Sequence, residues 1–223
     1  MDHLSVVEAA YAMGVSDRRV RALIRAGALA AQRVGGRWLV SRADVEQRAR
    51  RRGRPGRPLG ARNAWALVAR LSGDEWPDLA PWERSRLKQR LGRKSLLSLA
   101  YDLRERAEPH LFRGDERLVE RLRDDPAIVL SGVNAAAAYG VDIRAPGVVE
   151  AYVERARLPD LIYRYALRPA EIADANIVLR VVDASVPRTP HGVAPVAAVA
   201  LDLLESPNDR FRRAGRELAR RLR

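Results

Sequence analysis

Two short segments with helical spacing follow one another near the N-terminus, and only three residues separate them. The first has Ser5 and Glu8 at the spacing of a capping box, and apolar side chains recur at helical intervals over Val6–Met13. Gly14–Ser16 interrupts the pattern, because glycine readily takes the positive φ that ends a helix and serine caps the next one. A second helix is expected over Asp17–Arg25. Two short helices joined by so tight a turn predict a helix-turn-helix, whose second helix enters the major groove of DNA.

A hairpin and a third helix are predicted directly after this unit. Gly35 and Gly36 separate two short runs, Ala30–Val34 and Arg37–Val40, and consecutive glycines suit the two-residue turn of a β-hairpin. Ser41–Asp44 then has the pattern that opens a helix. The order helix, turn, helix, hairpin, helix predicts a winged helix-turn-helix.

The charge of the chain is concentrated at its two ends. The chain has 223 residues and a formal charge of +13, of which residues 1–70 contribute +10 and residues 210–223 contribute +6. Residues 71–209 are nearly balanced, at −3. The absence of cysteine excludes disulfides, thiol nucleophiles and Cys-ligated metal sites, and no apolar run is long enough to span a membrane. A cytoplasmic protein with two basic ends is therefore expected.

The N-terminal segment resembles the excisionase-like branch of the MerR superfamily. The likeness rests on Leu4–Ala10, Gly14–Ser16, Val20, Leu23–Gly27, Arg33–Trp38 and Ser41–Asp44. It implies that Arg18, Arg19 and Arg21 face the major groove and that the wing reaches a phosphate or the minor groove. The residues expected at the DNA are Ser16, Arg18, Arg19, Arg21 and Arg25 on the recognition helix and Arg33, Gly35, Gly36 and Arg37 on the wing. The competing interpretation is a solvated basic face on an ordinary small domain.

A run of arginines with glycine and proline follows. Its Arg52–Pro55 core is similar to an AT-hook, an extended segment that lies along a narrow A·T minor groove. Glycine lets the backbone approach the groove floor and proline keeps the chain extended. A stiff linker between domains is the alternative, and one segment can serve both roles. The expected minor-groove residues are Arg50, Arg51, Arg52, Arg54 and Arg57.

The rest of the chain has the pattern of a mixed α/β domain. Helical spacing predicts helices within 64–71, 81–87, 96–103 and 195–204, and apolar runs predict strands within 127–130, 147–153 and 176–182. Arg104, Glu105 and Arg106 are expected on the exposed side of the third of these helices, which Pro109 ends. Residues 210–223 predict a basic amphipathic helix.

Residues 125–222 contain a series of short segments that are characteristic together: Leu130–Gly132, Ala135, Ala136, Gly140, Glu150–Val153, Val178–Val182, Val193–Val196, Ala200–Pro207 and Arg212–Leu218. In these segments the chain resembles the C-terminal region of AbiEi-type antitoxins from type IV toxin–antitoxin systems. It implies a repressor that binds inverted repeats in double-stranded DNA of its own promoter. The toxin would be a separate nucleotidyltransferase, typically encoded by the next gene.

The terminal arginines have two interpretations. They form a second basic surface for DNA or an acidic partner, or they are solvated cations that suit the C-terminal end of a helix. The residues concerned are Arg210, Arg212, Arg213, Arg216 and Arg220.

The sequence contains none of several common catalytic motifs. There is no Walker loop, no Rossmann glycine fingerprint and no His-Glu-x-x-His, and the histidines are scattered. We expect no enzyme activity, metal or cofactor. An adaptor whose C-terminal domain binds a toxin or another partner is the alternative to a repressor; a recombination directionality factor would leave residues 71–223 unexplained.

The sequence therefore predicts a predominantly helical α+β fold in three parts. They are a winged helix-turn-helix over residues 1–49, a basic linker over 50–62, and a C-terminal antitoxin-like mixed α/β domain over 63–223.

Overall fold

The chain forms two compact units, Met1–Gly56 and Arg57–Arg223. A computed structural model describes residues 3–13, 15–26, 29–42, 44–45, 58–75, 77, 79–92 and 94–222, without the side chains of Tyr11 and Arg37. The described residues form helices and two separate sheets, which confirms the α+β class. No helix among them is both long and apolar enough to cross a membrane.

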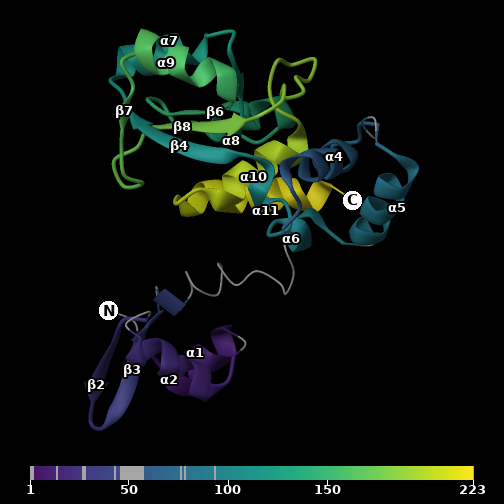
Figure 1. Ribbon diagram of the computed structural model, residues 1–223. Helices are drawn as coiled ribbons and strands as arrows, with labels where there is room; N and C mark the ends of the chain where they lie inside the picture. The colour runs from purple at the N-terminus through teal and green to yellow at the C-terminus, as the bar shows by residue number, and fades with distance from the viewer. Residues whose placement is uncertain are drawn as a thin grey trace. The chain divides into compact units, whose positions relative to one another are not determined.

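The N-terminal unit packs two helices against a small antiparallel sheet (Figure 1). Its elements are β1 (His3–Ser5), α1 (Val6–Met13), α2 (Asp17–Arg25), β2 (Ala31–Val34) and β3 (Arg37–Ser41). The strand order is β1-β3-β2, so the predicted hairpin is extended by a third strand. Strand β1 was not predicted, because it has three residues of which only Leu4 is buried.

Local hydrogen bonds define the ends of these elements as the sequence predicts. The Ser5 N–H donates to Glu8 Oε2 (2.8 Å) and the Glu8 N–H donates to Ser5 Oγ (3.2 Å), which completes the capping box. Gly35 and Gly36 have φ of 55° and 77°, so both take the left-handed conformation that a tight hairpin turn requires. After the wing, the Asp44 N–H donates to Ser41 Oγ (3.4 Å), and residues 42, 44 and 45 are helical.

The C-terminal unit is built on a five-stranded mixed sheet. Its strands are β4 (Glu108–Arg113), β5 (Ile128–Leu130), β6 (Val149–Glu154), β7 (Arg168–Pro169) and β8 (Ile177–Val182). The order is β5-β6-β8-β4-β7, in which β6 and β8 run parallel and the other pairs antiparallel. The central strands β6 and β8 are buried on both faces, as their nearly continuous apolar sequences predict.

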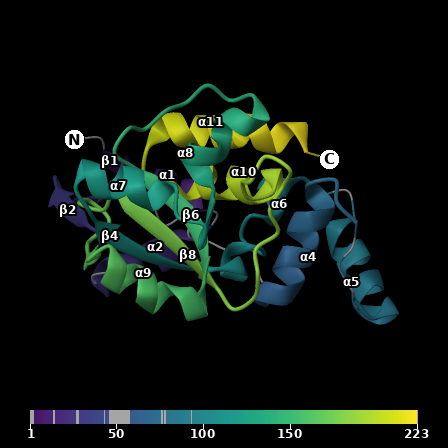
Figure 2. The same ribbon diagram turned by 90° about the horizontal axis from the view of Figure 1, so that it is seen from above.

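Helices cover both faces of this sheet (Figures 1 and 2). The helices are α4 (Ala61–Leu71), α5 (Pro81–Leu91), α6 (Leu96–Leu99), α7 (Glu116–Arg123), α8 (Gly132–Ala135), α9 (Leu158–Arg164), α10 (Val196–Glu205) and α11 (Asp209–Arg221), with 3-10 turns at Arg104–Arg106, Ala136–Tyr139 and Arg155–Arg157. Side chains of α7 and α9 share one apolar core with Ala151, Val153 and Leu179. Helices α4, α8 and α10 share the other core with Tyr152 and Val182.

Helices α10 and α11 lie in close contact. A Cβ at Gly215 of α11 would lie only 2.9 Å from Leu203 Cβ and from the backbone nitrogen of Leu204, both in α10. Only glycine permits this approach without displacing backbone atoms, so α11 is seated directly on α10.

The predicted third helix of the C-terminal unit is wrong in length and in the placement of Arg106. Helix α6 ends at Leu99, and Arg106 lies in a separate 3-10 turn with only 2% of its surface exposed. Pro109 lies inside β4 rather than at a helix end. Proline is tolerated there because β4 pairs with β7 only at Phe112 and Arg113, which leaves Pro109 without a partner on that side.

A buried charged cluster explains the position of Arg106. Its guanidinium pairs with Asp202, donates from Nε to the Tyr152 hydroxyl (3.0 Å) and donates from Nη1 to Glu205 Oε1 (2.8 Å). Arg180 of β8 also pairs with Asp202, with 2.9 Å between Nε and Oδ1. Asp202 is fully buried in α10, and its charge is compensated by the two guanidinium groups.

Two hydroxyl groups complete the bonding of Asp202. The Tyr152 hydroxyl donates to Oδ1 (2.9 Å) and the Ser131 hydroxyl donates to Oδ2. Burial raises the pKa of the Tyr152 hydroxyl, so this group stays protonated and able to donate. We name Arg106, Ser131, Tyr152, Arg180 and Asp202 the Asp202 cluster.

Glu150 lies beside the Asp202 cluster with one oxygen that has no hydrogen-bond partner in the described structure. A Cβ at Gly132 would lie 1.5 Å from this Oε2 atom, so glycine at 132 makes room for the carboxyl group. Burial raises the pKa of Glu150 to about 7, with Arg180 lowering it and Asp202 raising it further. The protonated form of Glu150 is therefore favoured in the folded chain up to near-neutral pH.

Removing the Asp202 charge should destabilise the C-terminal unit strongly. Asp202→Ala leaves Arg106 and Arg180 buried without their main counter-ion, a change that costs about 3–5 kcal/mol. The measurement is urea unfolding of the full chain by near-UV circular dichroism. Asp202→Asn keeps the shape and should lose most of the same stability, whereas Glu205→Ala, at a side chain 43% exposed, should lose much less. An Asp202→Asn chain as stable as the parent would contradict the role given to the charge.

Glu150 should make stability depend on pH. Its folded-state pKa of about 7 lies above the ordinary value of 4.5, so its contribution is fully present below pH 4.5 and is lost as pH rises through 7. The loss amounts to ~3 kcal/mol between these limits. Glu150→Gln should remove this slope in thermal unfolding from pH 5 to pH 8, whereas Glu120→Gln, at an exposed position, should retain it. An unchanged slope in Glu150→Gln would exclude Glu150 as its source.

Candidate nucleic-acid interface

Helix α2 separates an apolar face from a basic face. Val20 and Leu23 are buried against the small sheet and α1. The opposite side carries four exposed arginines, Arg18, Arg19, Arg21 and Arg25. Residues three and seven positions apart share one helix face, so Arg18, Arg21 and Arg25 form a row and Arg19 lies beside it.

The first three of these arginines have no partner among the described residues. Within the part of the chain that the structure describes, Arg18, Arg19 and Arg21 make no side-chain hydrogen bond or ion pair. Arg25 donates from Nε to the Arg21 carbonyl at 3.4 Å. Unpaired guanidinium groups retain their full set of planar donors, which match phosphate oxygens and the O6/N7 edge of guanine.

Ser16 fixes the start of the recognition helix. Its Oγ accepts a hydrogen bond from the Arg19 N–H at 3.3 Å, and its backbone is extended, as an N-cap requires. The hydroxyl hydrogen is not used in this contact and the residue is exposed, so it remains available to a phosphate. Asp17 in the first turn suits the positive end of the helix.

The wing presents an exposed tip. Val34 is 53% exposed, and no atom lies within 4 Å of a Cβ built at Gly35 or Gly36. Arg33 is exposed and donates from Nε to the Gly36 carbonyl at 3.5 Å, a long contact across the turn. The backbone places Arg37 at the start of β3, while its side chain lies outside the described residues.

The predicted minor-groove segment also lies outside the described residues. This applies to Arg50, Arg51, Arg52, Arg54 and Arg57, whose role stays a prediction. The end of the expected linker is described: the Leu59 N–H donates to the Asp102 carbonyl (2.9 Å), and α4 begins at Ala61.

The terminal helix α11 exposes most, but not all, of its expected basic residues. Arg210, Arg213, Arg216 and Arg220 are exposed. Arg212 is different, because its side chain is only 13% exposed and donates to the Ser206 and Pro207 carbonyls at 2.7 and 2.6 Å. It ties α11 to the preceding turn and does not belong to the exposed surface.

Arg42 is an exposed cation next to the wing that the sequence patterns did not predict. This residue follows β3, and its charge helps to hold the pKa of Glu8 below its ordinary value, after the larger effect of the hydrogen bonds from Ser5. The sequence offered one indication of this position: Arg42 comes directly after Ser41, the predicted cap of the helix that follows the hairpin.

Comparison with known families agrees with this geometry. Residues 4–53 match the family model of a helix-turn-helix domain. No curated protein and no solved structure matches the chain. The N-terminal segment thus matches a helix-turn-helix domain, a fold whose second helix commonly enters the major groove of DNA.

Arg21→Ala should relax sequence discrimination rather than weaken all binding equally. A single lost arginine–base contact reduces discrimination at one base pair by about 1–3 kcal/mol. Fluorescence anisotropy would measure this on DNA selected from a random pool by the full chain and then varied one base pair at a time. Arg33→Ala, on the wing, should instead lower affinity for all sequences alike and reduce the salt dependence. A uniform loss across the series for Arg21→Ala would remove Arg21 from base recognition.

Proposed function

We propose that this protein is a sequence-specific repressor that serves as the antitoxin of a type IV toxin–antitoxin system. It would bind inverted repeats in the promoter of its own operon, in the cytoplasm, with a nucleotidyltransferase-like toxin as the product of the neighbouring gene. The observation that carries DNA binding is a set of exposed arginines on the second helix of the helix-turn-helix domain, Arg18, Arg19 and Arg21, which have no partner in the part of the chain that the structure describes.

The antitoxin role is supported by where the antitoxin-like residues lie. Leu130–Gly132, Glu150–Val153, Val178–Val182 and Ala200–Pro207 are distant in sequence, yet each contributes to the Asp202 cluster or its immediate surroundings. The resemblance to AbiEi-type antitoxins thus rests on segments that meet in one buried cluster, and this is the observation that supports the antitoxin part of the proposal.

The remaining basic segments would contribute sequence-independent contacts. We assign the exposed arginines of α11, Arg210, Arg213, Arg216 and Arg220, to a second phosphate-binding surface, with the segment Arg50–Arg57 in the minor groove. Such contacts raise affinity by counter-ion release and position the protein without reading sequence.

An adaptor function is the second candidate. Tyr163 is 89% exposed and Ile172 is 64% exposed, both in the C-terminal unit. Large apolar side chains at the surface suit a protein contact, although single exposed residues are common on any protein.

A repressor of its own operon should bind selectively to the DNA upstream of its own gene. In a mobility-shift assay at physiological salt, the full chain should bind that DNA more tightly than a random duplex of equal length, by a factor of about 10³ or more. Arg18→Ala/Arg21→Ala should abolish the difference. Arg117→Ala/Arg168→Ala removes the same charge at exposed positions outside the proposed surface. This double variant should still bind the upstream DNA more tightly than the random duplex. Equal affinity of the unmodified chain for both duplexes would refute the repressor.

The antitoxin part is tested separately by co-expression. Induction of the neighbouring gene product should arrest growth, and the present chain should restore it. If operator binding holds and growth is not restored, the chain is a repressor without an antitoxin role. If the chain binds the neighbouring gene product but does not prefer its own upstream DNA over a random duplex, the adaptor function is favoured.

A further inference from the structure

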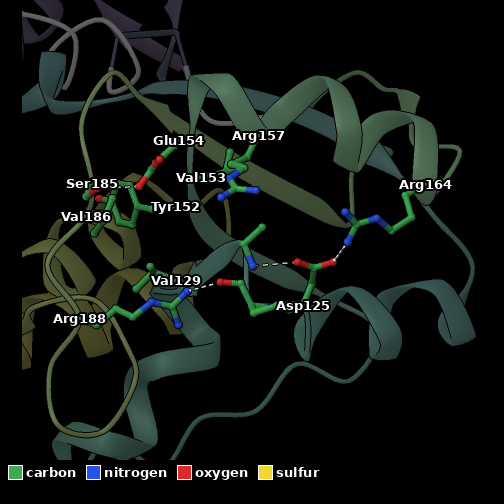
Figure 3. A pocket seen from close by; sticks show the side chains of 12 residues that line it. Asp125, Val129, Tyr152, Val153, Glu154, Arg157, Arg164, Ser185, Val186 and Arg188 are labelled. Carbon is green, nitrogen blue, oxygen red and sulfur yellow. Dashed lines mark hydrogen bonds and ion pairs between the residues drawn. The ribbon is translucent and has the colours of Figure 1, made fainter.

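A cavity of about 510 Å³ opens in the C-terminal unit, beside the ends of β5 and β6 and the segment 185–188. Three arginines from different segments line it: Arg157 before α9, Arg164 at the end of α9, and Arg188 after β8. Figure 3 shows Arg157 extending toward the middle of the cavity, with Arg164 and Arg188 at its sides. None of the three belongs to the surfaces assigned to DNA above.

Two of these arginines have no carboxylate partner. Arg157 is exposed and makes no side-chain hydrogen bond or ion pair with any residue that the structure describes. Arg188 donates from Nη2 to the main-chain carbonyls of Pro126 (2.5 Å) and Ile128 (2.7 Å). These carbonyls hold the guanidinium in place without neutralising it, so both positive charges remain available to an anion.

The third arginine is fixed by a buried aspartate. Arg164 donates to Asp125 Oδ2 at 2.8 Å and also pairs with Asp160. The side chain of Asp125 is 2% exposed and accepts further hydrogen bonds from the Tyr165 hydroxyl and the Ala127 N–H, each at 2.8 Å. Arg164 is therefore a rigid wall of the cavity, and its positive charge is already compensated.

The rest of the lining suits a ligand larger than an inorganic ion. Val129, Val153 and Val186, each at most 8% exposed, line part of the cavity, and Glu154 accepts a hydrogen bond from the Ser185 hydroxyl at 2.7 Å. A carboxylate and a hydroxyl beside apolar surface can bind the hydroxyl groups of a sugar. The volume lies in the range of small-molecule sites, well above the size of a phosphate ion.

We propose that this cavity binds a nucleoside phosphate, with its phosphate group between Arg157 and Arg188. Guanidinium groups from two directions match the several oxygens of a phosphate. The ribose hydroxyls would meet Glu154 and Ser185, and the base would occupy the part of the cavity that the three valines line.

Isothermal titration of the full chain, free of DNA, with adenosine 5′-monophosphate tests this proposal. Arg157→Ala should weaken binding by about tenfold or more, since it removes a charge-assisted contact. Arg157 has no partner in the described structure, so this variant should fold normally. Arg117→Ala, an exposed arginine of α7 outside the cavity, should leave the dissociation constant unchanged.

Arg188→Lys is a second variant, which keeps the charge but loses the planar donors, and it should also weaken binding. Inorganic phosphate should bind more weakly than the nucleotide, because it leaves the valines and Glu154 without contacts. The proposal is overturned if the nucleotide gives no saturable signal, if phosphate binds as tightly, or if Arg157→Ala binds normally. It is equally overturned if Arg18→Ala/Arg21→Ala, on the recognition helix, abolishes the signal.

Discussion

The buried carboxylate of Asp202 is the group on which the C-terminal unit depends. An isolated charge in a protein interior is strongly unfavourable, so its presence requires counter-charges and donors at fixed positions. These come from the turn before β4, from β6, from β8 and from the residue before α8. One side chain of α10 is thereby bonded to side chains from both central strands, Tyr152 of β6 and Arg180 of β8.

The two units are stabilised in different ways. In the N-terminal unit the described core is apolar, and the chain reversals depend on side-chain caps at Ser5 and Ser16 and on the glycine pair of the wing. Among the described residues of this unit no charged side chain is buried, and the guanidinium groups of Arg18, Arg19 and Arg21 make no ion pair with another described residue. The C-terminal unit buries arginines among carboxylates and hydroxyls. The chain thus uses arginine in two ways: Arg18, Arg19 and Arg21 are exposed, whereas Arg106 and Arg180 are buried beside a carboxylate.

Local sequence patterns predicted the local structure well. The capping box at Ser5, the cap at Ser16 and the Gly35–Gly36 turn depend on neighbours within a few positions, and the structure confirms each of them. Arg106 was misplaced because its main partner, Asp202, lies 96 positions away, beyond any periodicity. A signal existed all the same: Asp202 and Arg180 are single charges inside otherwise apolar segments. The roles of individual arginines at DNA depend on an absent partner, which no pattern within the chain specifies.

The contact at Gly215 has a mechanical consequence for the arginines of α11. At Gly215 the backbone of α11 lies directly against Leu203 and Leu204 of α10, and this close contact restricts rotation of the helix about its axis. Arg212 fastens the first turn to the carbonyls of residues 206 and 207 in addition. The backbone that carries the exposed arginines of α11 is therefore held in place. A binding partner would need to order only the side chains of these arginines.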